Sequence, residues 1–331
     1  MSKAGKSIPE NWWSQLRLPI ISAPMFLVSG PDLVKSCCLN GIIGSFPASN
    51  ARPIHVLDEW MSQLNGDLES AKLKDPNRKI APWAMNMVVH STYSRLPDEL
   101  ELIGKHKPQL VITSLGSPKL VVDIVHEYGG LVFSDVSDMK FARKAVETGV
   151  DGLILVASGA GGHAGQINSF AFVDMVRAFF DGIIILAGAI STGKGILAAQ
   201  AAGADMAYMG TRFIVAKESM ANDEYRKMLI ECTQEDIILT NAFSGVNANM
   251  LIPSIRKAGL EPEQLVKKEK IDFDDMQKGY SAKAWRDIWS AGHGVGVISR
   301  IESAAEIIER LEVEYKDAIK NLNRIANKLG T

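Results

Sequence analysis

Residues 182–213 read GIIILAGAISTGKGILAAQAAGADMAYMGTRF, and this stretch decides the fold. It contains an apolar run at 182–189, a segment of helical spacing at 193–203 that ends on glycine, and a second apolar run at 206–213. Helices often end at a glycine, and an apolar strand without polar alternation is buried on both faces, as in a parallel sheet. The stretch therefore predicts consecutive strand-and-helix units of an α/β protein.

The same alternation extends over the first two thirds of the chain. Short apolar runs of strand character alternate there with segments of helical periodicity. The runs lie at 19–25, 41–48, 80–89, 110–116, 130–136, 152–158, 182–189 and 206–213. Eight parallel strands, each followed by a helix, predict a closed (β/α)8 TIM barrel. An open Rossmann sheet is the alternative, but no GxGxxG fingerprint follows the first run.

The eighth predicted strand ends near residue 213, and more than a hundred residues follow it. Residues 216–235 and 300–330 have helical periodicity, and in the latter apolar residues recur every three or four positions, which indicates packing helices. The segment between is rich in Asn, Gly and aromatic residues, which suits a lid over the barrel mouth. We therefore expect a barrel over residues 1–235, a small C-terminal cap or substrate-binding segment over 236–299, and a helix in 300–331 that packs back on the barrel.

Composition excludes several classes of partner. The 36 Lys and Arg residues nearly balance 38 Asp and Glu residues, and they form no basic stripe of the kind that binds nucleic acid. The three cysteines, Cys37, Cys38 and Cys232, form no CxxC pair, so neither a disulfide framework nor a metal site is indicated. No apolar run is long enough to cross a membrane, and the N-terminus lacks the apolar core of a signal peptide. We expect a soluble cytoplasmic protein without metal.

The chemistry of a TIM barrel lies at the C-terminal ends of its strands. The small and polar residues at the predicted strand ends are Ala23, Pro24, Met25, Asn86, Thr113, Ser114, Ser134, Asp135, Ser158, Ala187, Gly188, Ala189, Met209, Gly210 and Thr211. Small residues after the seventh and eighth strands allow a phosphate to approach backbone N–H groups, which is the usual phosphate position of this fold. Thr211 can add a hydroxyl donor there.

The loop SGAGGHAGQ, residues 158–166, follows the sixth predicted strand and surrounds His163 with glycines. Such a loop can cradle a flat ring or a phosphate, or it can simply end a strand. A histidine there is a candidate base, because its usual pKa is near neutrality; the alternative is a histidine satisfied by backbone carbonyls under the lid. His90 and His293 are weaker candidates at the mouth, and we expect Trp285 and Trp289 to pack the cap.

Several of these pieces together resemble one flavoenzyme family. They are PIISAPM (19–25), WAMNMVVH (83–90), the AGGHAG core (160–165), LAGAISTGKG (186–195) and GADMAYMGTRF (203–213). Their order and spacing are similar to those of the FMN-dependent nitronate monooxygenases, formerly called 2-nitropropane dioxygenases, across residues 19–300. The resemblance implies non-covalent FMN and the oxidation of alkyl nitronates, such as propionate 3-nitronate, by molecular oxygen. That reaction would proceed by one-electron transfer and give a carbonyl product with nitrite or nitrate.

The resemblance also implies roles for individual residues. The flavin ring would lie against Ala23, Pro24 and Met25, with Asn86 hydrogen-bonded to it, and the phosphate would be held by Gly188, Gly210 and Thr211. Gly161 and Gly162 would run beside the cofactor, and Ser158 and Ala189 complete the cofactor-binding set. His163 matches the active-site histidine of the family. The partners would be a small nitronate or nitroalkane and O2; a homodimer is left open.

Two positions depart from the family pattern. Gly159 stands where better-studied members have glutamate, and Asp135 stands where some quinone-reducing relatives have lysine. An NAD(P)H-dependent quinone or enoyl-thioester reductase, which uses the same flavin barrel, therefore stays an alternative, as does a flavin-binding module without turnover. A nucleotide dehydrogenase of the IMP type is disfavoured, because no cysteine occurs between Cys38 and Cys232.

Overall fold

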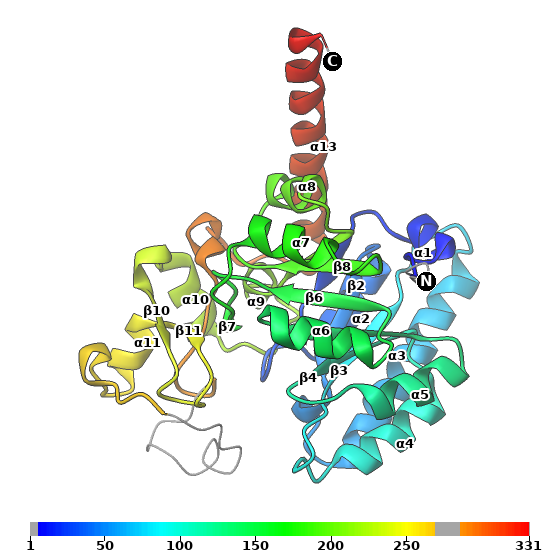
Figure 1. Ribbon diagram of the computed structural model, residues 1–331, viewed down its shortest axis with the longest axis horizontal. Coiled ribbons are helices and arrows are strands. Elements are labelled where there is room, and N and C mark those ends of the chain that lie inside the picture. The colour runs from blue at the N-terminus through cyan, green and yellow to red at the C-terminus, as the bar shows by residue number, and fades with distance from the viewer. Residues whose placement is uncertain (1–5, 269–284, 331) are drawn as a thin grey trace.

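The computed structural model describes residues 6–268 and 285–330, and its centre is a closed barrel of eight parallel strands (Figure 1). Around the barrel the strands follow the order β1-β2-β3-β4-β5-β6-β8-β9. Their bounds are Ile20–Ser22, Ile43–Pro47, Trp83–Val88, Leu110–Ser114, Leu131–Val136, Gly152–Val156, Ile183–Ala187 and Met206–Met209. The predicted (β/α)8 barrel is confirmed, and each predicted run contains one of these strands.

Closure depends on the first and last strands of the barrel. In the register of the sheet, Ile21 of β1 lies beside Ile43 on one side and Tyr208 of β9 on the other. Side chains alternate between the two faces of a strand, and the inward set forms one apolar cluster that includes Ile21, Ile112, Phe133 and Ile185. Ile8, Trp12 and Leu16, in and around α1 (Glu10–Gln15), belong to the same cluster.

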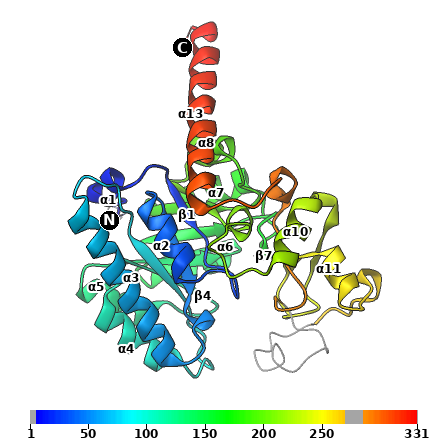
Figure 2. The ribbon, with the colours of Figure 1, turned by 180° about the vertical axis from the view of Figure 1, so that it is seen from behind.

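The helices that follow the strands form the outer layer (Figure 2). They are α2 Pro31–Leu39, α3 Ile54–Lys74, α4 Leu96–His106, α5 Lys119–Glu127, α6 Met139–Glu147, α7 Ser169–Arg177 and α8 Gly193–Ala201. After β9 come the short α9, Thr211–Ile214, and α10, Asp223–Glu231. Two of our predicted bounds were too long: the eighth strand ends at Met209 rather than at 213, and the helix predicted over 216–235 covers only α10.

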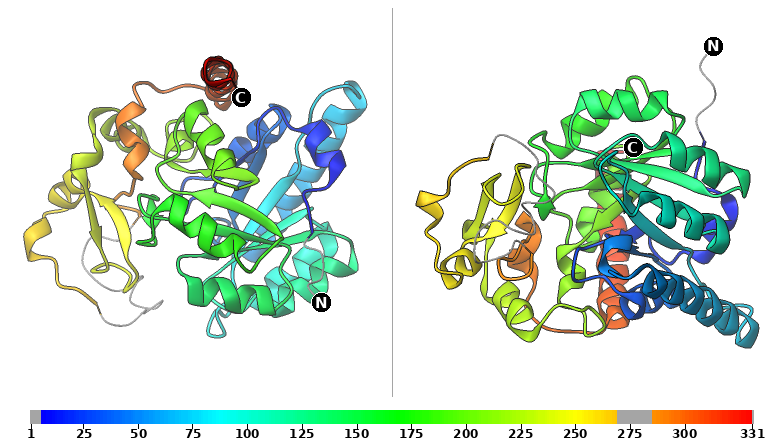
Figure 3. Two further views of the ribbon diagram at one scale, coloured as in Figure 1. Left: turned by 45° about the horizontal axis from the view of Figure 1, so that its top comes forward. Right: turned by 90° about the horizontal axis from the view of Figure 1, so that it is seen from below.

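A small second sheet lies to one side of the barrel (Figure 3). Its order is β10-β11-β7, with bounds Ile237–Thr240, Ala248–Leu251 and Gly162–His163. The helix α11, Ile252–Lys257, follows β11. The segment that we expected to form the cap, 236–299, contains β10, β11 and α11, whereas β7 belongs to the glycine loop after β6. Residues 269–284 of the segment lie outside the described part of the chain. The 3-10 turns are η1 Ala48–Asn50, η2 Gln234–Asp236, η3 Pro262–Gln264 and η4 His293–Val297.

The last helix, α13, covers Ala304–Leu329. Its first two turns pack against α8 and α2, where Ile307, Ile308 and Leu311 are fully buried. This helix therefore takes the place of the eighth outer helix of the barrel, although it begins far beyond β9 in the sequence. The third turn also contacts α8, because the Tyr315 hydroxyl donates to Gln200 Oε1. Beyond Tyr315 the helix extends away from the barrel (Figure 1, Figure 2). Among the described helices, none has both the length and the apolar character to cross a membrane.

A buried ion pair joins the start of α13 to the end of the barrel. Arg212 in α9 lies 3.2 Å from Glu302, just before α13, and both side chains are nearly inaccessible. Glu302 also pairs with Arg300 and Arg310, so one carboxylate balances three guanidinium groups. Removing one member of a buried pair leaves the other charge without its partner, which costs more than the pair itself contributes.

We expect Glu302→Ala to lower the free energy of unfolding by about 3–5 kcal/mol, because Arg212 would stay buried and unpaired. Urea unfolding followed by circular dichroism measures the change. Glu309→Ala is the matched control, since Glu309 lies on the exposed side of α13. Equal stability of the two variants would contradict this role for Glu302.

Candidate active site

Three polar side chains form the upper layer inside the barrel. Asn86, Asp135 and Tyr208 lie two positions after the inward-facing residues Ala84, Phe133 and Met206 on β3, β5 and β9. Because side chains alternate along a strand, the three also point inward, near the C-terminal ends of their strands. The Asn86 amide donates to the Ile112 carbonyl oxygen at 3.3 Å. The barrel thus has an apolar lower part and a polar rim.

Two buried oxygens of this layer have no hydrogen-bond partner among the described residues: Asp135 Oδ1 and the Tyr208 hydroxyl. Burial raises the pKa of Asp135 to about 7. Burial also raises the pKa of Tyr208, and the negative charge of Asp135 raises it further, which places the two groups close together. Buried polar atoms are rarely left unpaired, so this layer suits a polar ligand seated above it.

The glycine loop after β6 packs tightly against the loop at 290–293. A Cβ on Gly161 would lie 2.7 Å from the Gly292 nitrogen and 3.2 Å from Thr211 Oγ1, so only glycine fits between them. Thr211 Oγ1 accepts a hydrogen bond from Gly292 N at 2.9 Å. These contacts bring the ends of β6 and β9 together with the 290–293 loop.

Gly159 has a left-handed backbone conformation, with φ of +83°, which L side chains rarely adopt. A Cβ at this position would also come within 3.1 Å of the His293 ring. His293 N donates to the Gly159 carbonyl oxygen at 2.9 Å. In this chain, His293 thus lies where a side chain at position 159 would begin.

His163 is held by the small sheet rather than by the barrel. It lies on β7 and pairs with Ala248 of β11. Its ring meets Trp285 edge-to-face, with 5.2 Å between centroids, and its Nε2 lies 3.0 Å from Ser244 Oγ. Burial lowers the pKa of His163 to about 4, so the imidazole is neutral at neutral pH.

The hydrogen bonds of Ser244 indicate which nitrogen of His163 carries the proton. Ser244 Oγ donates its one hydrogen to the Val246 carbonyl oxygen at 3.1 Å, so it accepts from His163 Nε2. His163 Nδ1 is then the unprotonated nitrogen, and it has no hydrogen-bond partner among the described residues. The free lone pair of this ring can take up a proton or accept a hydrogen bond from a ligand.

The residues expected to hold the cofactor converge at the strand ends. A Cβ on Gly210 would lie 3.5 Å from Met25 Sδ and 3.7 Å from Ala23 Cβ, and a Cβ on Gly188 would lie 2.8 Å from the Ser158 carbonyl oxygen. Pro24 lies between Ala23 and Met25 after β1, and Gly162 begins β7. Thr211 begins α9, and the first N–H groups of a helix have no acceptor within that helix.

Ala189, one of the residues expected to bind the cofactor, has a backbone N–H that is already in use. It donates to the Gly159 carbonyl oxygen at 3.2 Å.

The remaining candidates from the sequence make other contacts. His90 Nδ1 lies 2.8 Å from Thr92 Oγ1 in a turn after β3. Trp289 is buried and stacks on Tyr225, whereas Trp285 contacts His163.

Sequence reasoning missed three residues of this site. Tyr208 lies in an apolar run where a tyrosine looks like an ordinary strand residue. Ser244 and Gly292 are distant from the glycine loop in the sequence, and no local pattern connects them to it. A long-range contact prediction would have been needed to find these two.

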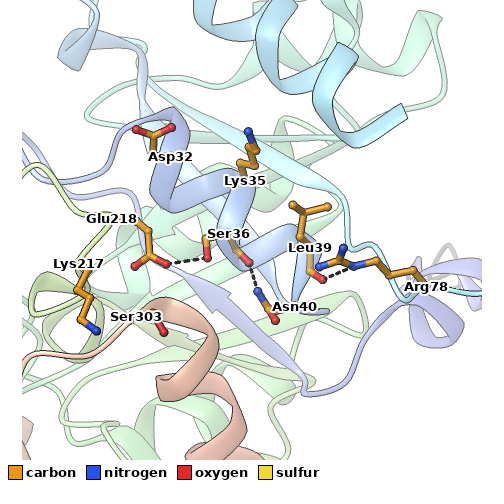
Figure 4. Close-up of a pocket in the computed structure, with 9 residues that line it drawn as sticks. All are labelled: Asp32, Lys35, Ser36, Leu39, Asn40, Arg78, Lys217, Glu218 and Ser303. Carbon is orange, nitrogen blue, oxygen red and sulfur yellow. Dashed lines mark hydrogen bonds between the residues drawn. The ribbon is translucent and has the colours of Figure 1, made fainter. Parts of the chain in front are cut away.

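A separate hollow of about 560 Å³ lies outside the barrel, along α2 (Figure 4). Its lining is Asp32, Lys35, Ser36, Leu39, Asn40, Arg78, Lys217, Glu218 and Ser303. Glu218 accepts from Ser36 at 3.0 Å and from the Ala304 N–H at 2.9 Å, so it fixes the start of α13. Within the described ranges, no group of three or more His, Cys, Asp or Glu could hold a metal ion.

The residues at the mouth fit a flavin. The glycine loop leaves backbone exposed beside the barrel axis, the orphaned Asp135 and Tyr208 oxygens offer polar groups beneath a planar ring, and Thr211 lies where a phosphate binds in this fold. Comparison with known proteins agrees with this geometry. The model of the nitronate monooxygenase family matches residues 12–314, and the chain belongs to that family.

A nitronate monooxygenase of Paraburkholderia phytofirmans is 27% identical over 93% of this chain and 95% of its own. FabK from Thermotoga maritima has a similar fold, with a TM-score of 0.77 and 22% identity over 96% of this chain and all of that chain. A nitroalkane oxidase from Streptomyces ansochromogenes gives a TM-score of 0.76 and 22% identity over 93% and 98% of the two chains. The chain is an oxidoreductase of a flavin-using family.

The raised pKa of Asp135 predicts how stability changes with pH. An acid whose pKa rises on folding stabilises the fold only while protonated, so this contribution is full below about pH 4, near the pKa of an unfolded Asp. It is lost as the pH rises through about 7. We expect Asp135→Asn to exceed the wild type in free energy of unfolding by on the order of 2 kcal/mol at pH 8, and by much less at pH 5.

Urea unfolding at both pH values tests this expectation. Asp123→Asn is the control, because Asp123 is exposed on α5. The same difference between Asp135→Asn and the wild type at pH 5 and pH 8 would show that Asp135 does not ionise in this window.

Proposed function

We propose that this member of the family oxidises alkyl nitronates, such as propionate 3-nitronate, with molecular oxygen and non-covalently bound FMN. Bound FMN would supply the ring that accepts an electron from the substrate. Gly188, Gly210 and Thr211 would hold its phosphate, and Ala23, Met25 and Asn86 would contact the ring. The cap segment, residues 236–299, would form the substrate side of the site.

The observation that carries the choice of substrate is the neutral state of His163. A general base works best when its pKa is near the working pH, and burial has moved the pKa of His163 down to about 4. The imidazole is therefore a weak base for removing a carbon-bound proton from a neutral nitroalkane. A nitronate has already lost that proton, so it needs no base.

The same histidine suits an anionic substrate. A negative charge beside the ring raises the pKa of a histidine, so His163 would take up a proton at Nδ1 when a nitronate binds. Ser244 would keep the ring in place through Nε2, at 3.0 Å. The resulting imidazolium would orient the nitronate oxygens, and Trp285 would shield one edge of the ring from water.

Two measurements test the proposal together. The purified protein should show the visible spectrum of a flavin, and oxygen uptake should begin when propionate 3-nitronate is added. A colourless protein that cannot be reconstituted with FMN would refute the cofactor. Bleaching of the flavin by NADH without oxygen, together with no turnover of the nitronate, would identify a reductase instead.

The role of His163 gives a sharper prediction. We expect the wild type to turn over a neutral nitroalkane far more slowly than the nitronate, and His163→Asn to change that low rate little, because an imidazole with a pKa of about 4 is a weak base. Activity on the nitronate should fall by about tenfold, equivalent to 1.4 kcal/mol, because the imidazolium that orients the anion is lost. His55→Asn, on the exposed surface of α3, is the control and should change neither. Equal losses on both substrates would rule out this division of roles.

A further inference from the structure

The upper layer inside the barrel contains two titratable side chains, Asp135 on β5 and Tyr208 on β9. Neither carboxyl oxygen of Asp135 has a hydrogen-bond partner among the described residues, and only Oδ1 is inaccessible. The Tyr208 hydroxyl is likewise buried and unpartnered there. Phe133 and Met206, one layer below, are fully buried. The accessible oxygen of Asp135, Oδ2, therefore faces the barrel mouth.

The carboxyl group of Asp135 has no positively charged neighbour in the described part of the barrel interior. By the alternation that places Asp135 there, the other strands contribute uncharged side chains at the same height: Ala23, Ser45, Asn86, Ser114, Val156 and Ala187. The helices α5 and α6 pack on the outer face of β5, so their charged side chains lie on the far side of that strand. An isolated buried carboxylate is costly, and burial raises the pKa of Asp135 to about 7. Below that pH the acid holds its proton and is a hydrogen-bond donor.

A ligand that satisfies this pair of side chains must offer hydrogen-bond acceptors at the barrel mouth. The acid of Asp135 and the phenol of Tyr208 can each donate one hydrogen bond. In a flavin ring, the acceptors are the carbonyl oxygens and unprotonated nitrogens of the pyrimidine side, whereas the dimethylbenzene side has none. The pyrimidine side is therefore the one that matches Asp135 and Tyr208.

We propose that Asp135 binds the flavin, an inference that rests on the cofactor of the proposed function: its protonated carboxyl group donates a hydrogen bond to the pyrimidine side of the ring. Tyr208 donates a second hydrogen bond there. Reduction adds negative charge to this side of the ring, which a neutral donor stabilises and an ionised carboxylate would repel. Asp135 thus does with a shared proton what a lysine would do with a full positive charge.

FMN binding to the apoprotein, followed by quenching of FMN fluorescence, tests this contact without turnover. Between pH 5.5 and 8.5 we expect the dissociation constant of the wild type to rise about tenfold or more relative to that of Asp135→Asn. Above the Asp135 pKa of about 7, binding to the wild type requires uptake of a proton that the Asn side chain does not need. The ratio of the two constants reports Asp135, because titration of the FMN phosphate affects both proteins equally.

Three further variants complete the comparison. Asp123→Asn, exposed on α5, should follow the wild type at both pH values. Asp135→Ala should also lose the pH dependence, but it should bind FMN more weakly than Asp135→Asn because it has no donor. Tyr208→Phe should weaken binding about 2–10-fold at both pH values, since burial raises the pKa of Tyr208 and its hydroxyl stays protonated throughout. Unchanged helical circular dichroism shows that each variant folds.

The reduction potential of bound FMN gives a second readout. Xanthine with xanthine oxidase supplies the electrons, and a reference dye in the same cuvette reports the potential. Between pH 7 and 8.5 we expect the potential of the wild type to fall more steeply with pH than that of Asp135→Asn. In the wild type, reduction of the ring draws one further proton from solvent onto Asp135, because the added negative charge raises the pKa of that acid.

The same pH dependence in the wild type and Asp135→Asn, in binding or in potential, would overturn the inference and assign the unpartnered oxygens to ordered water. Failure of the wild type to bind FMN at both pH values would overturn the cofactor of the proposed function as well. The expected pH dependence without oxygen uptake on propionate 3-nitronate would reject the proposed substrate and leave the role of Asp135 standing.

Discussion

The ladder between β1 and β9 is the contact on which the rest of the structure depends. Ile20 pairs with Ala207, and the Ala23 N–H donates to the Met209 carbonyl oxygen at 3.0 Å, so the sheet closes on itself. Closure brings the C-terminal ends of all eight strands to one rim. Gly210 then lies beside Ala23 and Met25, although nearly two hundred residues separate them. In an open sheet these segments would lie at opposite edges.

The glycine loop connects the barrel to the cap sheet, which is the small sheet β10-β11-β7. Gly161 packs so closely on Gly292 that the two backbones act as neighbours, and the next two residues, Gly162 and His163, form a strand of the cap sheet. The position of the histidine is therefore set by β11 and by Ser244, not by the barrel alone. Movement of the cap sheet relative to the barrel would move His163 relative to the rim.

The barrel and most of the strand-end residues could be predicted from the sequence because both follow local rules. Apolar runs and glycine-ended helices repeat along the chain, and a barrel places every strand end in the same region. The cap sheet could not be predicted in this way. β7 is two residues long and exists only through its pairing with β11, more than eighty residues away. The periodicity over 300–330 likewise predicted α13, but a stripe of apolar residues does not say which part of it meets the barrel.

Burial explains why the site carries so little charge of its own. It raises the pKa of Asp135 and lowers that of His163, so both groups are driven toward their neutral forms. A glutamate at position 159 would add a buried negative charge at a backbone conformation that only glycine adopts easily, and His293 already lies beside that position. In the proposed reaction, an anion would bind through backbone N–H groups and through a proton taken up by His163 when the anion arrives. The charge of the complex would then be set by the ligand, and the protein would supply dipoles and one imidazole that can respond to it.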